Sequence, residues 1–448
     1  MTEPDLPVRL RCSVSRTTPH SFQRRNTLMR IKSLAAVAAV AVLGVGLAAC
    51  SSGGDSADST TLSVTASTND KNALDTVVPM FEKANPGVKV NVTTSALDQY
   101  QPAIRTQLSS GTAPDVIGVW PGGGNAASML TLVPGGFLAD LSEIARVDEF
   151  PDSIKSVAQV DGKTYIAPTS FSGIGPIYNM TAMEESGFTV PTTWSELMQF
   201  CTDATAKTGK PAFYLGAGTS WNTQLITYAL TPTLVYGPNP DFAAKMADGK
   251  ATFAGSEWTT ALDQYMEMVD QGCFEADPLG VSYESSMTAL ATGETFGATF
   301  VTSGLAGLRA EAPEDTKFSM EALPATDNAD NTRMAGAAGS AYAINAKAKN
   351  PELAKKFVEF LLSPEGMAAY AQANGTLPSI PSADAIDSAL TTLQKFQQEN
   401  KTDPWMDQLW PNARVQAAHF AAVQNLLAGT ATTEDGLLAM DEAYAQGE

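Results

Sequence analysis

The stretch Asp161–Met180, DGKTYIAPTSFSGIGPIYNM, decides the fold that we expect for this chain. It opens with an Asp-Gly pair, which favours a tight hairpin turn because both residue types tolerate the left-handed backbone of such turns. The apolar residues 165–167 then indicate a strand. Pro168 blocks further ladder pairing because proline has no backbone N–H to donate.

The second half of the stretch predicts a bend followed by another strand. Ser170–Gly175 is small, polar and glycine-bearing around a single aromatic residue, Phe171. This composition is typical of backbone that bends and that a ligand can approach closely. Ile177 and Tyr178 indicate that a strand resumes there. We interpret the whole stretch as the place where the chain crosses from one half of the molecule to the other.

The residues near the start of the body predict alternating strands and helices. Thr61–Thr68 alternates apolar and polar residues as a half-buried strand does, and residues 88–92 repeat this pattern. Between them, apolar residues recur at helical spacing from Leu74 to Phe81. A strand, a helix and a strand in this order indicate α/β architecture.

A glycine-rich loop, WPGGGN from Trp120 to Asn125, follows the apolar run 116–119. Open α/β sheets bind ligands outside the carboxyl ends of their strands, so this loop is a candidate ligand contact. It lacks the Lys-Ser/Thr ending of a P-loop, which argues against a phosphate site.

Several short sequence segments along the chain resemble those of one family, the extracytoplasmic solute-binding proteins of ABC transporters. The resemblance is to the large group that binds sugars and includes the maltose-binding proteins (extracellular solute-binding protein family 1). It extends over about Thr61–Ala445. The segments are the crossing stretch, FEKANPGVKV (81–90), SSGTAPDV (109–116), PTTWSELMQF (191–200) and, as the most specific, KNPELAKKFVEFLLSPEG (349–366).

This resemblance implies an α/β, two-lobe periplasmic-binding-protein-like fold, in which each lobe is an α/β sandwich and the ligand cleft lies between the lobes. The segment 333–345, RMAGAAGSAYAIN, resembles the return crossing. Hinges near Pro168–Gly175 and Arg333–Gly336 would then let the lobes close on a ligand. The expected lobes are 61–168 with 335–380 (lobe I) and 169–334 with 381–448 (lobe II).

The amino-terminal segment predicts export. Met29–Cys50 has a basic start, a short apolar run and small residues before Cys50, as a secretory signal does, so we expect the true start at Met29 and a signal peptide over residues 1–49. The end resembles a bacterial lipobox, which implies lipid modification of Cys50. Residues 50–60 are expected to form a flexible tether, which leaves an extracytoplasmic protein lipid-anchored to the bacterial cell membrane. The alternative is an uncleaved anchor helix, although the run is shorter than the roughly 20 residues of a spanning helix.

The charge of the chain limits its partners. Its formal net charge is −20. Nucleic-acid binding requires Lys and Arg that replace counterions, so we expect no nucleic-acid partner. Adhesion to anionic lipid beyond the Cys50 anchor is disfavoured for the same reason.

Histidine and cysteine are scarce. After the predicted cleavage only His419 remains, and no nucleophile-elbow motif is present, so most nucleophilic and zinc chemistry is disfavoured. We expect no enzyme, no cofactor and no metal. Cys201 and Cys273 are the other thiols after Cys50, and they form either a disulfide in an oxidising compartment or two separate buried thiols.

A sugar has apolar C–H faces, which aromatic rings cover, and hydroxyl groups, which polar side chains pair. We therefore predict a site built from residues in or beside loops of different segments. Trp405 is an alternative to Trp410. The aromatic candidates are Trp120, Phe171, Trp221 and Trp410, and the polar candidates are Asn125, Ser170, Asn222, Thr302 and Ser303.

The expected function is that of a monomeric binding protein that captures a neutral sugar or oligosaccharide between its lobes. The family resemblance implies delivery to the permease subunits of an ABC transporter. The main alternative is the same fold with a charged solute, such as a phosphorylated sugar, an amino acid or a polyamine. For an anionic ligand, Arg309, Arg333 and Arg414 are the candidate cations. Further alternatives are a secreted glycosidase with paired carboxylates and a purely structural surface lipoprotein.

Overall fold

The computed structural model describes residues 60–339, 341–381 and 387–446. All of them fall within Asp55–Glu448, the second of two units into which the chain divides. The predicted signal peptide, Cys50 and all of the tether except Thr60 lie outside the described residues. Within the described ranges, no helix is both long and apolar enough to cross a membrane.

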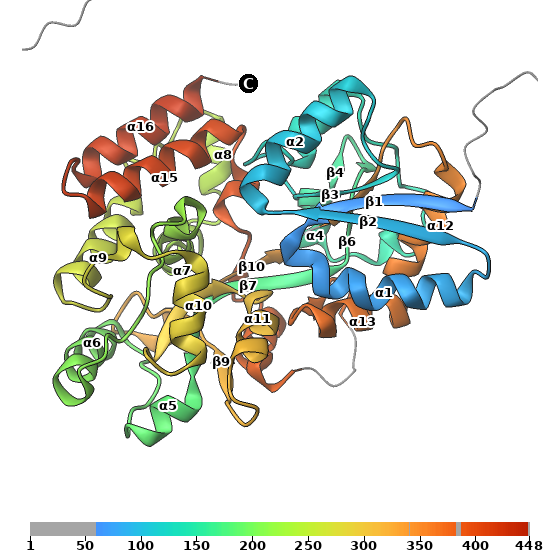
Figure 1. The fold of residues 1–448 in the computed structure, drawn as a ribbon. Coiled ribbons are helices and arrows are strands. Elements are labelled where there is room, and N and C mark those ends of the chain that lie inside the picture. Colours follow the sequence, from blue (N-terminus) through green and yellow to red (C-terminus); the bar gives the residue numbers. More distant parts are fainter. Residues whose placement is uncertain (1–59, 340, 382–386, 447–448) are drawn as a thin grey trace, which may run out of the picture. The chain divides into compact units, whose positions relative to one another are not determined.

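The first of two larger sheets in the described residues has five strands in the order β2-β1-β3-β11-β6 (Figure 1). β2 and β3 run parallel to β1, whereas β11 runs antiparallel to both β3 and β6. Its strands are β1 (Thr61–Ser67), β2 (Lys89–Ser95), β3 (Val116–Val119), β6 (Ala167–Pro168) and β11 (Ala341–Ile344).

The second sheet is organised around β7, which pairs antiparallel with β12, β10, β8 and β9. Its strands are β7 (Ser170–Asn179), β8 (Gly297–Val301), β9 (Phe318–Met320), β10 (Met334–Ala338), β12 (Leu377–Pro378) and β13 (Thr402–Asp403).

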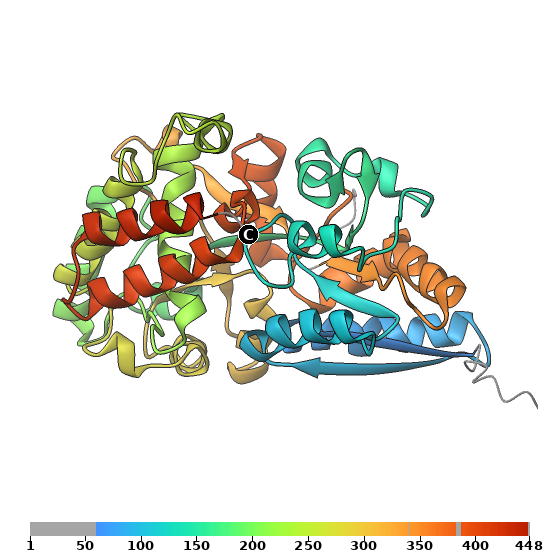
Figure 2. The same ribbon diagram turned by 90° about the horizontal axis from the view of Figure 1, so that it is seen from above.

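Helices surround both sheets, and α15 and α16 lie side by side beyond the second (Figures 1 and 2). The helices near the first sheet are α1 (Lys71–Ala84), α2 (Leu97–Ser110), α3 (Met129–Leu132), α4 (Asp152–Ala158), α12 (Pro351–Leu362) and α13 (Pro364–Ala373). The others are α5 (Met180–Glu185), α6 (Trp194–Thr208), α7 (Leu225–Thr231), α8 (Phe242–Ala247), α9 (Trp258–Asp270), α10 (Tyr283–Ala291), α11 (Gly304–Glu311), α14 (Thr391–Gln398), α15 (Ala413–Leu427) and α16 (Thr433–Ala445).

The start of the chain's body follows the predicted pattern. The strand, helix and strand expected there are β1, α1 and β2, and the helical repeat from Leu74 to Phe81 is the buried face of α1. Phe81 meets Phe357 of α12 edge to face, with ring centroids 5.1 Å apart. The observed order of strand, helix and strand confirms the α/β prediction, and the apolar residues that suggested the helix form its buried face.

The predicted hairpin is also present. β4 (Gln159–Val160) and β5 (Lys163–Thr164) pair antiparallel through Asp161 and Gly162, whose φ angles are 50° and 75°. Positive φ at both central residues is what a two-residue hairpin turn requires, and Asp-Gly meets that requirement at low cost. Pro168 ends β6 at an edge of the first sheet, where no further N–H is needed.

The predicted bend at Ser170–Gly175 is wrong, because these residues form the first part of β7, which is buried along its whole length. The glycines serve close packing instead. A Cβ on Gly175 would lie 2.3 Å from the Glu321 carbonyl oxygen, and one on Gly173 would lie 2.7 Å from Leu393. The chain therefore changes sheets at Thr169, between β6 and β7, without a loop.

The return crossing lies slightly later than predicted. The predicted segment Arg333–Gly336 overlaps β10, which belongs to the second sheet, whereas β11 belongs to the first. The chain thus passes back between Ala338 and Ala341, and the predicted boundary at residue 335 falls inside a strand of the second sheet.

Cys201 and Cys273 form a disulfide, with their Cα atoms 4.6 Å apart. The bond joins α6 to the segment that follows α9, so of the two alternatives for these thiols the structure shows the bonded one. The bond closes a loop with a sequence separation of 72 residues.

Replacing both cysteines, Cys201→Ser with Cys273→Ser, is expected to lower the free energy of unfolding by about 4 kcal/mol, because the unfolded chain regains the entropy of a long open loop. Denaturant unfolding of the oxidised protein and of the double variant measures this loss. Reductant should destabilise the natural protein and leave the double variant unchanged. Equal stability of the two proteins under oxidising conditions would contradict the prediction.

Candidate ligand-binding site

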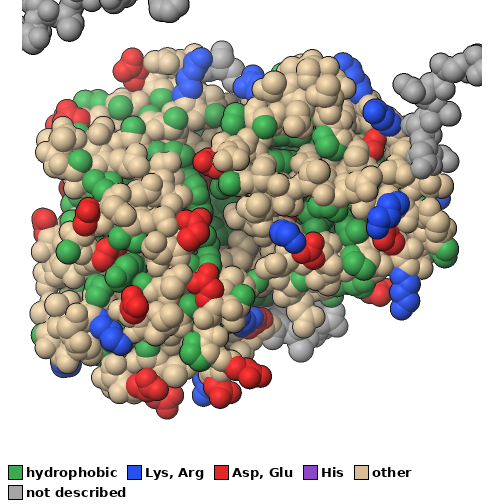
Figure 3. All heavy atoms as spheres, in the orientation of Figure 1, with side chains coloured by type: hydrophobic (Ala, Val, Ile, Leu, Met, Phe, Trp, Pro, Cys, Tyr) green, Lys and Arg blue, Asp and Glu red, His purple; other side chains and the backbone are tan. Residues whose placement is uncertain are grey.

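A cavity with an empty volume of about 990 Å³ is lined by residues that come from both sheets and their helices. Figure 3 shows the surface hollowed between these two groups of elements, with hydrophobic side chains inside. This volume includes space that is open to solvent. Each side of the cavity therefore depends on segments far apart in the sequence.

Residues near the first sheet form one side of the cavity. Asn69 comes from the turn after β1, and Asp98 and Gln101 come from the first turns of α2, which follows β2. Trp120 and Asn125 come from the glycine-rich loop after β3. This side thus lies at the carboxyl ends of the parallel strands, where open α/β sheets place their ligands.

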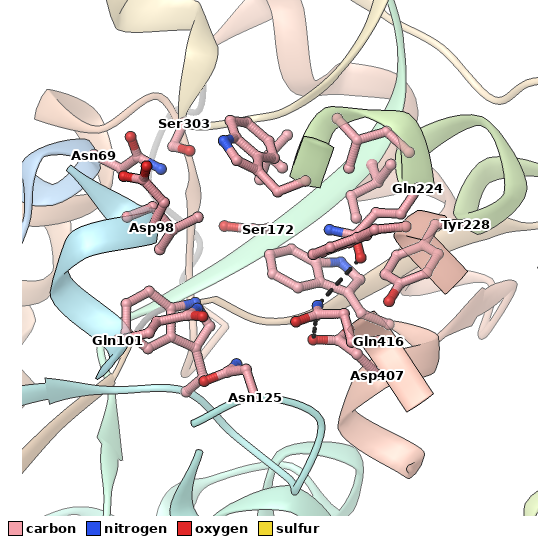
Figure 4. A pocket seen from close by; sticks show the side chains of 18 of the residues that line it. Asn69, Asp98, Gln101, Asn125, Ser172, Gln224, Tyr228, Ser303, Asp407 and Gln416 are labelled. Carbon is pink, nitrogen blue, oxygen red and sulfur yellow. Dashed lines mark hydrogen bonds between the residues drawn. The ribbon is translucent and has the colours of Figure 1, made fainter. Parts of the chain in front are cut away.

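Residues around the second sheet form the other side. Trp221 and Gln224 lie in the short helical segment Ser220–Gln224, Tyr228 lies on α7, and Gln416 lies on α15. Figure 4 shows Gln224, Tyr228, Asp407 and Gln416 opposite Asn69 and Asp98. The two sides hold both aromatic rings and hydrogen-bonding groups.

The structure brings five of the nine predicted contacts together at this cavity. They are Trp120, Asn125, Ser170, Trp221 and Ser303. The Trp221 ring is supported from behind by Tyr283, with ring centroids 4.8 Å apart. Trp120 is similarly supported by Tyr100, at 5.8 Å. These contacts fix two aromatic rings beside the cavity before any ligand arrives.

The other four predicted contacts do not line the cavity. Phe171 and Thr302 are buried in the packing around β7. The amide nitrogen of Asn222 donates to the Leu215 carbonyl oxygen at 2.5 Å. Trp410 is 2 % exposed and packs against the rings of Tyr228, Phe253, Trp258 and His419.

Trp405, the alternative to Trp410, lines the cavity. The two tryptophans are separated by the short helical turn Met406–Leu409, which directs one toward the cavity and the other into the core. Local sequence pattern does not distinguish these outcomes, because both tryptophans lie beside the same short segment.

Sequence reasoning missed much of the polar lining. Asp98 and Gln101 carried a usable signal, since they begin the helix that follows a parallel strand. No local sequence signal marked Gln224, Asp407 and Gln416, because only tertiary packing brings these three residues together. The missed lining residues are Asn69, Asp70, Leu97, Asp98, Gln101, Ser172, Ile174, Ser220, Gln224, Leu225, Tyr228, Val301, Asn374, Asp407, Gln416 and Phe420.

Gln416 links two of these polar groups. Its amide nitrogen donates to Gln224 Oε1 at 3.2 Å and to Asp407 Oδ2 at 3.3 Å (Figure 4). Burial raises the pKa of the Asp407 carboxyl to about 6. Burial, followed by the nearby Asp407 charge, also raises the pKa of Tyr228 well above its usual range.

The charged groups of the cavity are acidic. Asp70, Asp98 and Asp407 are among its lining, and none of the described lining residues is a lysine or an arginine. Arg309 and Arg333 pair instead with Asp387 and Asp403, respectively. Arg414 is exposed on α15 and does not line the cavity. The cations that an anionic ligand would need are therefore not supplied by the described lining.

The glycine-rich loop lies directly against the backbone of the segment that carries Asp407. A Cβ on Gly122 would lie 2.1 Å from the Gln408 carbonyl oxygen, and one on Gly124 would lie 2.1 Å from that of Asp407. Real Cβ atoms do not approach backbone this closely. The glycines thus allow a close backbone contact between the loop that carries Trp120 and Asn125 and the segment that carries Asp407.

A family model described as bacterial extracellular solute-binding protein matches residues 76–404. Among curated proteins, the chain is similar to a multiple sugar-binding protein of Streptococcus mutans serotype c. The two are 24 % identical over 345 residues, which cover 75 % of this chain and 78 % of the relative. A putative binding protein of Brucella abortus is also 24 % identical, over 66 % of this chain and 70 % of its own length.

Solved structures share the fold. A solute-binding protein, RafE, in complex with raffinose has a TM-score of 0.74 and 21 % identity, covering 86 % of this chain and 99 % of its own. A chitin oligosaccharide binding protein has a TM-score of 0.73 and 20 % identity, covering 87 % and 98 %. A sugar transporter protein of Bacillus licheniformis in complex with stachyose has a TM-score of 0.70 and 20 % identity, covering 86 % and 99 %.

The substitution Gly124→Ala tests the backbone contact at the base of the cavity. We expect it to lower the free energy of unfolding by about 1–3 kcal/mol, because the added methyl group overlaps the Asp407 carbonyl and the backbone has to shift. Chemical unfolding measures the loss.

Gly307→Ala on α11 is the matched control, because its added Cβ meets the flexible Met287 side chain at 2.8 Å and alanine favours the helix. Equal stability effects of the two substitutions would contradict the importance of the loop contact.

Proposed function

Since the chain belongs to the bacterial extracellular solute-binding protein family, we propose that it captures a neutral sugar or oligosaccharide in the cavity between its two larger sheets. Family membership implies an extracytoplasmic location. The observation that carries the proposal is the lining itself: Trp120, Trp221 and Trp405 lie around one cavity together with amide and carboxyl groups.

This lining matches the chemistry of a sugar. The indole rings offer faces for the C–H surfaces of pyranose rings, while Asn125, Gln101 and Gln224 offer acceptors and donors for hydroxyl groups. The similarity to proteins whose names and titles refer to sugars, raffinose, stachyose and chitin oligosaccharides supports the same ligand class.

The acidic lining weighs against the anionic members of the charged-ligand alternative. A phosphorylated sugar would face Asp98 and Asp407 with no cation among the described lining residues. A cationic solute, such as a polyamine, is the second candidate because the same carboxylates would attract it.

We propose that the ligand closes the two halves of the molecule on each other. Lobe I would comprise 61–168 and most of 335–380, and lobe II would comprise 169–334 and 381–448, with hinges at Thr169 and between Ala338 and Ala341. Contacts from both lobes stabilise a closed form more than an open one. The monomeric closed form would dock on ABC transporter permease subunits, held near the membrane by the lipid on Cys50.

A thermal-shift screen tests the ligand class. The panel contains raffinose, stachyose, maltotriose and chitin oligosaccharides, with a sugar phosphate, an amino acid and spermidine alongside. A neutral sugar at about 100 times its Kd should add roughly 2.7 kcal/mol to the free energy of unfolding. Stabilisation by the sugar phosphate or spermidine alone would contradict the neutral-sugar proposal, and turnover of a bound oligosaccharide would revive the glycosidase alternative.

Trp221→Ala is expected to weaken the binding of the best neutral sugar about tenfold, since a stacked aromatic contact contributes about 0.5–1.5 kcal/mol beyond its buried area. Calorimetric titration measures the change in Kd. Trp194→Ala is the control, because Trp194 begins α6 and does not line the cavity. Unchanged affinity in Trp221→Ala would remove this ring from the site.

Hinge closure predicts a smaller radius of gyration in the presence of saturating sugar. Small-angle scattering of the protein with and without the ligand measures it. Identical dimensions in the two states would contradict closure while leaving sugar binding intact.

A further inference from the structure

Asp407 is a buried carboxylate with few partners. It is 6 % exposed, and its Oδ2 accepts a hydrogen bond from Gln416 at 3.3 Å. Its Oδ1 has no partner at strict hydrogen-bond geometry among the described residues, although the Tyr228 hydroxyl and the Gln408 backbone N–H lie close enough to favour its charged form. No ion pair among the described residues includes Asp407, so its charge has neutral groups, the Gln416 amide and the Tyr228 hydroxyl, as neighbours rather than a cation.

The position of this carboxylate is fixed from its backbone. Asp407 belongs to the helical turn Met406–Leu409, and Gly124 of the opposite side packs against its carbonyl oxygen and Cβ. Its side chain lines the cavity beside Gln224 and Tyr228 (Figure 4). The carboxylate therefore lies in the cavity wall. The contact with the glycine-rich loop restricts movement of its backbone away from the cavity.

A buried carboxylate without a full set of donors is unfavourable, and a ligand that brings a donor relieves this cost. A hydroxyl group is suitable, because O–H···O⁻ hydrogen bonds are short and about twice as strong as neutral ones. A phosphate or carboxylate group on the ligand would instead repel Asp407.

We propose that Asp407 is the specificity-determining residue of this cavity: its Oδ1 accepts a hydrogen bond from a hydroxyl group of the bound sugar, so the affinity falls as the solution is acidified. The inference rests on the proposed function and adds to it one contact and its dependence on pH.

Two of the titratable groups beside Asp407 are neutral over the pH range of interest, and the remaining carboxyl groups of the cavity are separated from Asp407 by the Asp407→Asn variant described below. Tyr228 on α7 has a pKa raised well above 10 by burial, and burial lowers the pKa of His419 on α15 to about 3, so both stay neutral between pH 5 and pH 8. Asp70 and Asp98 face the same cavity from the first-sheet side. Arg414 lies exposed on α15 and does not line the cavity.

The sign of the pH effect on affinity depends on which protonation state of Asp407 binds the sugar. The carboxylate accepts the ligand's hydroxyl proton, whereas the protonated carboxyl loses the charge that strengthens this bond. Burial raises the pKa of Asp407 to about 6, so the binding form predominates at pH 8 and is the minor form at pH 5. Affinity should therefore be about tenfold lower at pH 5 than at pH 8.

The test is a calorimetric titration between pH 5 and pH 8. The probe is whichever of raffinose, stachyose, maltotriose and chitobiose stabilises the protein most at pH 8. Asp407→Asn, which keeps the shape of the side chain, should bind this sugar more weakly at pH 8 and with a Kd that does not change with pH. The control is Asp148→Asn, an exposed carboxyl that does not line the cavity, which should keep the natural pH dependence.

Equal affinity of the natural protein at pH 5 and pH 8 would overturn the inference while sugar binding stands. The natural pH dependence in Asp407→Asn would overturn it as well. If none of the four sugars binds at pH 8, the proposed function fails and the inference fails with it. Thermal melting of each protein at both pH values confirms that the compared species are folded.

Discussion

The site depends on a contact between two backbones. The glycine-rich loop after β3 lies against the carbonyl groups of residues 407 and 408, and any side chain on Gly122 or Gly124 would occupy the same space as those carbonyls. Because these glycines have no side chains, the loop that carries Trp120 and Asn125 lies against the segment that carries Asp407. The glycine run, which lacks the ending of a P-loop, therefore brings two distant segments together.

β7 imposes the second constraint. A strand with neighbours along both edges and packing on both faces has no room for large side chains at every position, which explains Gly173 and Gly175. The two crossings between the sheets lie at one end of β7 and one end of β10. If the proposed hinges are correct, a change in the angle between the sheets at these crossings would change the width of the cavity.

Sequence alone predicted the elements whose rules are local. The Asp161-Gly162 turn, the buried face of α1 and the position of the glycine-rich loop at the cavity after β3 follow from turn chemistry, helical spacing and strand direction. The prediction from sequence was wrong at Ser170–Gly175, because small residues are compatible both with a bend and with a closely packed strand. It also could not separate Trp405 from Trp410, or find Asp407 beside Gln416, since the neighbours that decide these cases come from remote segments.

The unsatisfied groups of the cavity define what it can bind. Asp407 Oδ1, Asn374 Oδ1 and Trp405 Nε1 have no hydrogen-bond partner among the described residues of the protein. An apolar ligand would leave these two acceptors and one donor buried and unpaired, each at a cost of about 1–3 kcal/mol. Under the proposed function, a sugar would bring both O–H donors and oxygen acceptors to this wall, which also holds the unpaired Tyr228 hydroxyl, while the indole faces would cover its C–H groups. Under that function, selectivity for a sugar would arise as much from what other ligands leave unpaired as from what a sugar gains.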